Sequence, residues 1–292
     1  MMRFAIVVSA MMAAAASQAG EPRNWSVCPA PGPGCDFAGG PGIQGAIDAA
    51  APGDTVTLRA GRYTAEGYRE IPYKEVVVRG FVVIDGKDLS LTGESGAVLD
   101  GATGSPTTAI IVRKATAAIR GLTLTGFRYD VQEDDFYEGH GLFVIDADVR
   151  ASDLIISKFQ KMGLIGRGAS RLMAERLQIV DGHVGIWLRE TAYLALVDCT
   201  VSRNDSSAIA AYGDSVAHVR DCAFEGNQDD GLFTEHRATI YAESSRITGN
   251  RPYGARAVGD STIWLIGGEL SGNDRDTNGS LGRSRVRRVA SP

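Results

Sequence analysis

The sequence predicts an all-β fold, a single-stranded right-handed parallel β-helix with an N-terminal capping helix. Three observations predict it: a repeat of about 23 residues, apolar columns in step with that repeat, and a short amphipathic segment before the first regular strand. The repeat is clearest in asparagines spaced 23 residues apart: Asn204, Asn227, Asn250 and Asn273. We expect them in tight turns, because Asn tolerates the left-handed conformation and its amide can bond to the amide stacked above.

Apolar residues with the same period define the strands that face inward. One column is Leu142, Leu164, Ile186, Ile209, Leu232 and Ala255. A second is Val149, Leu172, Leu194, Ala217, Ile240 and Ile263, and a third, three positions before the asparagines, is Val201, Phe224, Ile247 and Leu270. Each repeat is therefore expected to contain three short strands. A single repeat cannot bury its apolar side, but stacked repeats about 4.8 Å apart form three parallel sheets around a continuous core.

The chain is expected to divide into four segments. Residues 1–19 combine Arg3, an apolar run and the ending Ser17-Gln18-Ala19, which is typical of a secretory signal peptide and shorter than the about 20 residues that a membrane span needs. Residues 20–42 form a Cys/Pro/Gly-rich N-terminal segment, residues 43–282 the β-helix domain, and residues 283–292 a basic flexible tail. We therefore expect a periplasmic or secreted protein without a membrane span.

The four cysteines favour an oxidising compartment over a metal site, since metal-type CxxC pairs are absent. Cys28 and Cys35 are expected to staple the N-terminal segment. Cys199 and Cys222 occupy successive positions of one inward column, where the strand spacing permits a disulfide but parallel Cβ directions make its torsion awkward. A bond and a reduced pair both stay open there. The net charge of −5 argues against a nucleic-acid partner, and the oligomeric state stays open.

The segment Ile43–Ala51 places Ile43, Ala46 and Ile47 on one helical face and predicts the cap over the first coil. With the turn and strand that follow, it reads IQGAIDAAAPGDTVTLRAGRY. This stretch resembles the opening of secreted pectate-lyase-like β-helix proteins, and the resemblance covers about Ile43 to Gly282. It implies a group of mostly polysaccharide lyases, hydrolases, esterases and uronate epimerases, with some non-catalytic members. The chain has no Asp-Pro-His-Asp of the alginate epimerases, so no catalytic residue is carried over.

Alternation around the Leu142 column sends two sets of side chains outward, onto the face that we take as the candidate site. The first set is Phe143, Ile165, Trp187, Ala210, Phe233 and Arg256, and the second is Ile145, Arg167, Arg189, Tyr212, Glu235 and Val258. Arg167 and Arg189 should stack as like charges, which is unfavourable unless an anion such as a sugar carboxylate is bound. The alternative is that the arginines extend into water and the aromatic residues pack beneath a loop.

Roles follow from polyuronate chemistry, in which a cation neutralises the substrate carboxylate and a base removes the neighbouring ring proton. Arg167 and Arg189 are the predicted neutralising cations, His183 or Tyr212 the base, and Glu235 a positioning or acid group. The substrate-binding candidates are Phe143, Trp187, Phe233, Arg256, His140 and Asp230. Glu235 and Asp230 would suit a hydrolase only if their turn folds back toward the sheet.

A long insertion, RYDVQEDDFYEGH, lies before the strand that begins at Leu142, where loops tend to carry function. Its acidic residues are Asp130, Glu133, Asp134, Asp135 and Glu138. They are compatible with Ca²⁺ but lack the spacing of a calcium-binding loop, and a solvated acidic lid is the alternative. We assign no metal ligands.

The sequence thus favours an exported lyase or epimerase acting on an acidic, uronate-containing polysaccharide. The alternative is a non-catalytic glycan-binding or periplasmic accessory β-helix protein, which would need the aromatic residues but not the base. A metal-assembly role would need a convergent His, Met or Cys cluster, and the histidines are scattered.

Overall fold

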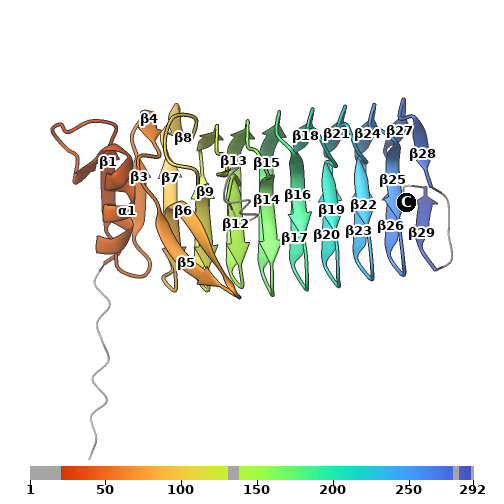
Figure 1. The fold of residues 1–292 in the computed structure, drawn as a ribbon, viewed down its shortest axis with the longest axis horizontal. Helices are drawn as coiled ribbons and strands as arrows, with labels where there is room; N and C mark the ends of the chain where they lie inside the picture. The colour runs from red at the N-terminus through yellow and green to blue at the C-terminus, as the bar shows by residue number, and fades with distance from the viewer. Residues whose placement is uncertain (1–20, 131–137, 279–282, 291–292) are drawn as a thin grey trace, which may run out of the picture.

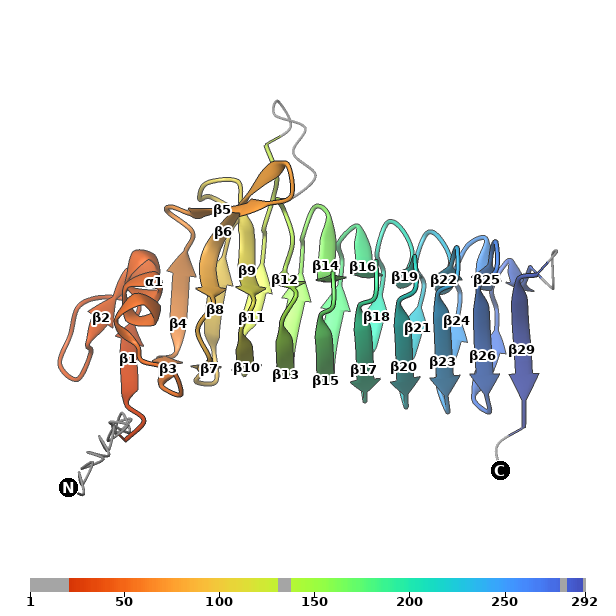
Figure 2. The same cartoon turned by 90° about the horizontal axis from the view of Figure 1, so that it is seen from below.

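The computed structural model describes residues 21–130, 138–278 and 283–290 as a solenoid of stacked coils (Figures 1 and 2). Its described strands form a 19-stranded sheet, here called sheet A, and a 10-stranded sheet, here called sheet B. Pairing between coils is parallel, with a single antiparallel exception among the described strands, β5 with β6. The predicted β-helix is therefore confirmed.

Each complete coil contributes one strand to sheet B and two to sheet A. Sheet B consists of β5 (Arg69–Tyr73), β6 (Val76–Asp85), β9 (Thr108–Arg113), β12 (Leu142–Ile145), β14 (Met162–Arg167), β16 (Val184–Leu188), β19 (Ile209–Ala211), β22 (Leu232–Thr234), β25 (Tyr253–Ala257) and β28 (Arg275–Thr277). The predicted Leu142 column is in register, for example Leu142 with Leu164 and Ile209 with Leu232.

Sheet A has two strand columns. The first is β1 (Asn24–Cys28), β3 (Thr55–Leu58), β7 (Leu89–Gly93), β10 (Thr116–Arg120), β13 (Asp148–Ser157), β15 (Arg171–Val180), β17 (Tyr193–Val197), β20 (Val216–Arg220), β23 (Thr239–Glu243), β26 (Thr262–Ile266) and β29 (Arg285–Val289). The second is β4 (Gly61–Thr64), β8 (Ala97–Asp100), β11 (Thr123–Thr125), the ends of β13 and β15, β18 (Thr200–Ser202), β21 (Ala223–Glu225), β24 (Arg246–Thr248) and β27 (Glu269–Ser271), while the short β2 (Phe37–Ala38) pairs with β1.

A single left-handed residue makes the corner between the two columns of sheet A. Asp153 has φ 55°, and its counterparts in later coils, Asp198 and Asp221, have φ 54° and 55°. Asp adopts this conformation at less cost than bulky or β-branched residues do. In β13 the strand runs through the corner without interruption, which joins into one sheet two of the three sheets that the sequence predicted.

The asparagine ladder occupies the turn that leads into sheet B with its amides stacked, as predicted, but the left-handed residue is the one before each asparagine, such as Arg203 (φ 54°) and Gly226 (φ 63°). Asn227 is fully buried, and its Oδ1 accepts hydrogen bonds from the backbone N (3.1 Å) and Nδ2 (2.9 Å) of Asn204. Its own Nδ2 donates to Asn250 Oδ1 at 2.9 Å and to Val201 O at 3.2 Å. Each amide therefore satisfies backbone groups of the turn that would otherwise be buried without partners.

The N-terminal end is capped by α1 (Gly39–Ala49), whose buried residues include Ile43, Ala46 and Ile47. The predicted helical face is correct, but the helix begins four residues before Ile43. Residues 20–42 are not a separate segment, because β1 pairs in parallel with β3 and extends sheet A by one strand. The Cys28–Cys35 disulfide is present, with Cα atoms 5.7 Å apart.

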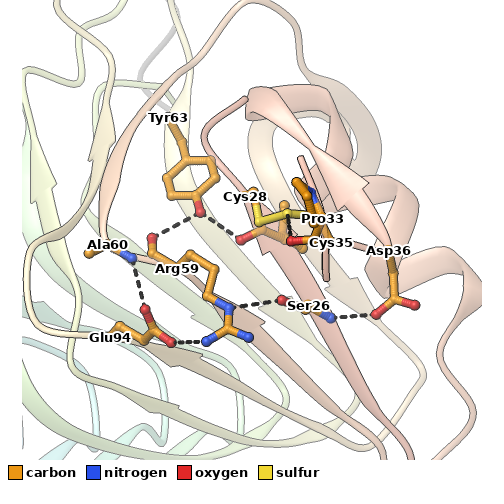
Figure 3. Close-up of a disulfide and its surroundings, with 10 residues drawn as sticks. Ser26, Cys28, Pro33, Cys35, Asp36, Arg59, Ala60, Tyr63 and Glu94 are labelled. Atoms are coloured by element: carbon orange, nitrogen blue, oxygen red, sulfur yellow. Dashed lines mark hydrogen bonds and ion pairs between the residues drawn. A yellow bond between two sulfur atoms is a disulfide. The ribbon is translucent and has the colours of Figure 1, made fainter. Parts of the chain in front are cut away.

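Tyr63 anchors this end of the molecule, next to the disulfide (Figure 3). Its buried hydroxyl lies 2.7 Å from Val27 O and 2.9 Å from Arg59 O. Arg59 in turn donates to Glu94 at 2.6 Å, so β1 and the coil that follows it are tied together by polar contacts as well as by the core.

The C-terminal basic segment differs from the prediction. Instead of a flexible tail, Arg285–Val289 form β29, which pairs in parallel with β26, and Val286 packs against the core. Cys199 and Cys222 form a disulfide between neighbouring coils, with Cα atoms 4.6 Å apart, which decides the alternative that the sequence left open. No helix within the described ranges is long and apolar enough to cross a bilayer.

Candidate functional site

The outward face of sheet B carries the two predicted columns, and the first is in register along the coils. Ile165 pairs with Trp187, Trp187 with Ala210, Ala210 with Phe233, and Phe233 with Arg256. The sequence therefore placed the candidate side chains correctly in the repeat. Their exposure, however, differs sharply between the two halves of the face.

A β-hairpin covers the N-terminal half of this face. β5 and the first part of β6 pair antiparallel, from Arg69 with Gly80 to Tyr73 with Val76, and cross over the neighbouring strands of sheet B (Figure 1). The apolar residues of the hairpin and of the sheet beneath it form one buried cluster: Ile71, Tyr73, Val78, Val83, Ile111, Phe143, Ile145 and Ile165. Phe143 is thus fully buried beneath Tyr73, with ring centroids 5.8 Å apart, and its prediction as a substrate-binding residue is wrong.

Arg167 is not available to a substrate carboxylate either. Only 5% of it is exposed, and its Nε and Nη2 donate to the two carboxylate oxygens of Glu190 at 3.0 and 2.8 Å. Lys74, at the hairpin turn, donates to the same carboxylate at 2.6 Å, and Gly168 N at 2.7 Å. The hydrogen bonds from Arg167 are the largest cause that holds the pKa of Glu190 well below its usual range. The predicted neutralising role of Arg167 is therefore wrong, because the protein supplies its anion.

The two predicted histidines lie in different environments. His140 is fully buried, its Nδ1 accepts a hydrogen bond from Met162 N at 3.2 Å, and its ring packs edge-on against Phe143. It therefore cannot reach a substrate, and its prediction as a binding residue is wrong. His183 is exposed just before β16, and no contact in the described part of the chain joins its imidazole to Arg189 or Tyr212.

Three outward aromatic rings lie on the C-terminal half of the face: Trp187 and Tyr212 are partly exposed, whereas Phe233 is 9% exposed and belongs to the same buried cluster as the hairpin residues. Trp187 lies 5.6 Å from Tyr212, and Tyr212 lies 5.6 Å from Phe233, edge to face. The exposed Arg189 holds its guanidinium carbon 6.0 Å from the Trp187 ring and 5.6 Å from the Tyr212 ring. These positions put flat apolar surface and a positive charge side by side, and no carboxylate among the described residues pairs with Arg189. We call Trp187, Tyr212, Phe233 and Arg189 the aromatic-arginine row.

Tyr212 is held in its protonated form. Burial, followed by the negative charge of Glu235, raises the pKa of the Tyr212 phenol above its ordinary value. A phenol of this kind is suited to donate a proton at neutral pH rather than to accept one. This reverses the direction of transfer predicted for the pair, in which Tyr212 was a candidate base and Glu235 an acid.

Asp230 and Arg256 lie beside the aromatic-arginine row, at its C-terminal end. Asp230 is fully buried, and its Oδ2 accepts a hydrogen bond from Arg256 Nε at 2.5 Å. Its Oδ1 is buried and has no hydrogen-bond partner within the described ranges. Burial raises the pKa of Asp230 to about 6, although Arg256 opposes this. The guanidinium of Arg256 lies 4.7 Å from the Phe233 ring, so it links this carboxyl to the aromatic rings.

The acidic insertion is described only at its ends. Glu133, Asp134 and Asp135 lie outside the described residues, so the calcium prediction is untested there. Glu138 is fully buried and bonded to Arg79 at 3.0 Å, which makes it part of the support for the hairpin rather than an open ligand. The described residues contain no cluster of three or more groups suited to a metal ion.

Sequence reasoning missed the hairpin and its ion pair with Glu190. The available signal was two short extended segments, Arg69–Tyr73 and Val76–Gly80, joined by Lys74 and Glu75. This connection lacks the Asn or Gly that marks most two-residue hairpin turns, and Lys74 instead adopts φ 56°. Without the hairpin, every outward residue of sheet B looked equally exposed.

Comparison with known proteins identifies the fold family. A model of the right-handed β-helix region matches residues 108–270, more than half of the chain. The chain belongs to the right-handed β-helix family. A search of the curated proteins finds no relative of this β-helix protein.

Solved structures agree on the architecture. The β-helix protein is similar to the crystal structure of pectate lyase Pel9A, with a TM-score of 0.62 and 12% identity over 92% of this chain and 77% of the other. It is also similar to the alginate lyase of Paenibacillus sp. str. FPU-7, with a TM-score of 0.57 and 14% identity over 92% and 99% of the two chains. At these identities the likeness concerns the fold, and the expected pectate-lyase-like β-helix is confirmed.

Proposed function

We propose that the protein acts on an acidic, uronate-containing polysaccharide as a lyase or an epimerase, at the aromatic-arginine row of sheet B. The observation that carries this proposal is the position of Arg189, exposed over Trp187 and Tyr212 without a carboxylate partner among the described residues. A uronate ring offers both an apolar face for the aromatic rings and a carboxylate for the guanidinium. The two solved lyases of the same fold support this class of substrate.

The row, together with Glu235 and His183 on the same side of the molecule, can supply each component of the reaction. Arg189 neutralises the substrate carboxylate and so acidifies the ring proton at C5. Glu235 or the exposed His183 takes that proton. In a lyase the C4–C5 double bond then forms, the bond from C4 to the linking oxygen breaks, and Tyr212 protonates the leaving oxygen. In an epimerase the C4–O bond stays intact, and Tyr212 returns a proton to the opposite face of C5.

Arg256 and Asp230 provide support at the C-terminal end of the row. Arg256 Nε is bonded to Asp230, its Nη2 lies 3.9 Å from Asp229, and its guanidinium is near the Phe233 ring, so the N–H groups not used by these two carboxylates are the ones that it can offer to a second sugar carboxylate. Asp230 orients Arg256 in this role. In this proposal Arg256 keeps the binding function that the sequence indicated, whereas the fully buried Asp230 is a positioning residue instead of a binding residue.

The test is incubation with alginate, pectate, glucuronan and glycosaminoglycans while the absorbance of unsaturated uronates is followed. Epimerisation is followed separately, as deuterium incorporation at C5 by NMR in D₂O. Arg189→Ala is expected to lower kcat/KM at least about tenfold, because a charge-assisted contact contributes about 1.5–3 kcal/mol. Arg246→Ala is the matched control, since Arg246 is an exposed arginine paired with Glu225 on sheet A.

Three results separate the alternatives. Product formation that depends on Arg189 supports the enzyme. Glycan affinity that depends on Arg189 without product or exchange assigns a binding module instead. Absence of product with every polymer, together with the same glycan affinity in Arg189→Ala and wild type, contradicts both the activity and the choice of face.

We also propose that the protein is exported to the periplasm or beyond. Two disulfides, Cys28–Cys35 and Cys199–Cys222, fit an oxidising compartment better than the cytosol. A polysaccharide substrate would be encountered in the same place.

A further inference from the structure

We infer that the β5–β6 hairpin closes one end of the aromatic-arginine row, so that the protein engages an acidic polysaccharide at a chain end and releases products one or two sugars long. This inference rests on the proposed function and adds the mode of attack to it. It is carried by the place of the hairpin on sheet B, because a flat β-helix face would otherwise accept the interior of a long chain.

The row defines the direction in which a sugar chain lies. Trp187, Tyr212 and Phe233 come from three successive coils, and their neighbouring ring centroids are 5.6 Å apart. Successive coils are stacked along the long axis of the molecule (Figure 1). Phe233 is only 9% exposed, so the rings open to a sugar chain are Trp187 and Tyr212, and a chain that contacts both must run along this axis, toward or away from the hairpin.

The hairpin is fixed firmly across that path. Its β5 strand pairs antiparallel with β6, and Tyr73 packs against Phe143 of β12. Arg113 donates to Pro72 O at 2.5 Å, and Lys74 at the turn reaches Glu190, next to Arg189. The hairpin is therefore held by residues of β9 and β12, and the Lys74 side chain extends from its turn to Glu190, in the turn that follows β16.

The charge at the barrier suits the end of a polyanion. Three cations, Lys74, Arg167 and Arg189, lie in this region, and Glu190 is the carboxylate that pairs with two of them. The surplus positive charge falls on Arg189, the member of the group that faces the row. An acidic chain is thus attracted to the barrier but cannot continue past it.

The distance from the barrier to the reacting groups limits the product. The ion pair of Glu190 lies in the coil of β16, and Tyr212 lies in the next coil, about 4.8 Å further along the axis. This spacing accommodates about one sugar ring between the hairpin and the bond that would react. Reaction at Tyr212 therefore removes a short terminal unit in each turnover.

The decisive experiment measures stoichiometry as well as products. Purified oligouronates of increasing length are titrated into the Tyr212→Phe variant by calorimetry, and wild-type protein is sampled early in the reaction with the polymer. We expect a fixed number of protein molecules per chain, set by the ends and independent of length. From wild type acting as a lyase we expect one- and two-sugar products from the first time point, with slow loss of polymer viscosity.

Two kinds of result would contradict chain-end binding. A stoichiometry that rises with chain length, or an early ladder of intermediate products, overturns chain-end binding while leaving the proposed function intact. Absence of binding at every length overturns the proposed function, and this inference with it.

A shortened hairpin provides the structural test. Replacing residues 71–77 by two glycines removes the barrier, and the stoichiometry should then rise with chain length. Because this change uncovers Phe143 and its neighbours, folding is checked by thermal unfolding, and the wild-type stoichiometry decides the inference if the variant does not fold. Glu75→Ala is the matched control, since Glu75 is exposed at the hairpin turn, and its loss leaves the backbone of the hairpin and the Lys74–Glu190 contact in place and should keep the wild-type stoichiometry.

Discussion

Asp230→Asn removes a charge that the fold holds in an unfavourable place. Asp230 is fully buried, its Oδ2 is bonded to Arg256, and its Oδ1 has no hydrogen-bond partner in the described part of the chain. Burial raises the pKa of this carboxyl from its ordinary 3.8 to about 6. The folded protein therefore binds this proton more tightly than the unfolded chain does, and ionising Asp230 lowers stability.

The size and sign of the change in the free energy of unfolding follow from the difference between the pKa of Asp230 in the folded protein and in the unfolded chain. A rise of about two pKa units corresponds to about 3 kcal/mol, at 1.36 kcal/mol per unit. Relative to the ionised carboxyl, the proton bound by Asp230 stabilises the folded state below pH 4. This stabilisation declines as the pH rises from about 4 to 6 and is absent above that range. Asparagine resembles the protonated carboxyl and cannot ionise. The free energy of unfolding of Asp230→Asn should therefore gain about 3 kcal/mol relative to wild type between pH 4 and pH 7.5.

The assay is denaturant unfolding of both proteins at pH 4, 5, 6 and 7.5 at constant ionic strength. The difference between variant and wild type cancels the titration of the other carboxylates. Asp214→Asn is the control, because hydrogen bonds from Arg237 lower the pKa of the exposed Asp214, so its difference should move in the opposite direction. A difference for Asp230→Asn that does not change with pH would refute the reasoning.

The same variant connects stability with function. An acid that is kept although it destabilises the fold at neutral pH is a candidate for a functional role. We therefore expect Asp230→Asn to be more stable than wild type at pH 7.5 and yet to have a higher KM on the polyuronate. Wild-type kinetics in a stabilised Asp230→Asn would show that Arg256 needs no carboxylate to position it.

The remaining predictions concern the scaffold. Asn227→Ala should lower the free energy of unfolding by about 3 kcal/mol in denaturant titrations, because it removes the four hydrogen bonds of a buried amide; a loss below 1 kcal/mol would contradict a structural role for the ladder. Arg167→Met should cost about 2 kcal/mol and leave the affinity for glycans unchanged, because Arg167 serves Glu190 rather than a ligand; a large loss of affinity would restore its predicted role. Replacing Cys28 and Cys35 together by serine should lower stability by about 2–3 kcal/mol, measured by thermal unfolding against the oxidised wild type.

Much of the fold was predictable because the same apolar pattern recurs in every coil. Inward columns such as Leu142 and Leu164 recur with the period of the coil, so one correct alignment places every later strand, and the observed register agrees. The asparagine ladder follows from the same period. Burial of an aliphatic side chain stabilises by about 1.5–3 kcal/mol, so a column repeated through many coils dominates the choice of structure.

The site was less predictable, because alternation tells which side chains point outward but not what covers them. Phe143 and Trp187 occupy equivalent positions of one column, yet Phe143 is fully buried and Trp187 is partly exposed. The difference comes from the β5–β6 hairpin, which belongs to a single coil and so leaves no periodic signal. The carboxylate that occupies Arg167 lies 23 residues away, one coil later, and no local pattern pairs the two.

The C-terminal segment shows a related limit. Its arginines suggested a solvated tail, but Val286 lies in register with Ile263, and the strand extends sheet A by a further coil. Arg287 then stands over the Trp264 ring at 5.0 Å, with its charge directed to solvent. Outward positions tolerate arginine because only alternate residues need to be apolar.

The inward and outward side chains of sheet B have different roles, and this explains why its outward face can hold groups that lower the stability of the fold. The inward columns stabilise every coil in the same way, so a single coil can accommodate the buried carboxyl of Asp230 without losing its place in the stack. The hairpin buries the same outward columns in the N-terminal coils, where they add to stability instead. The aromatic-arginine row begins where that cover ends, and the end of the hairpin therefore both defines the site and limits what can enter it.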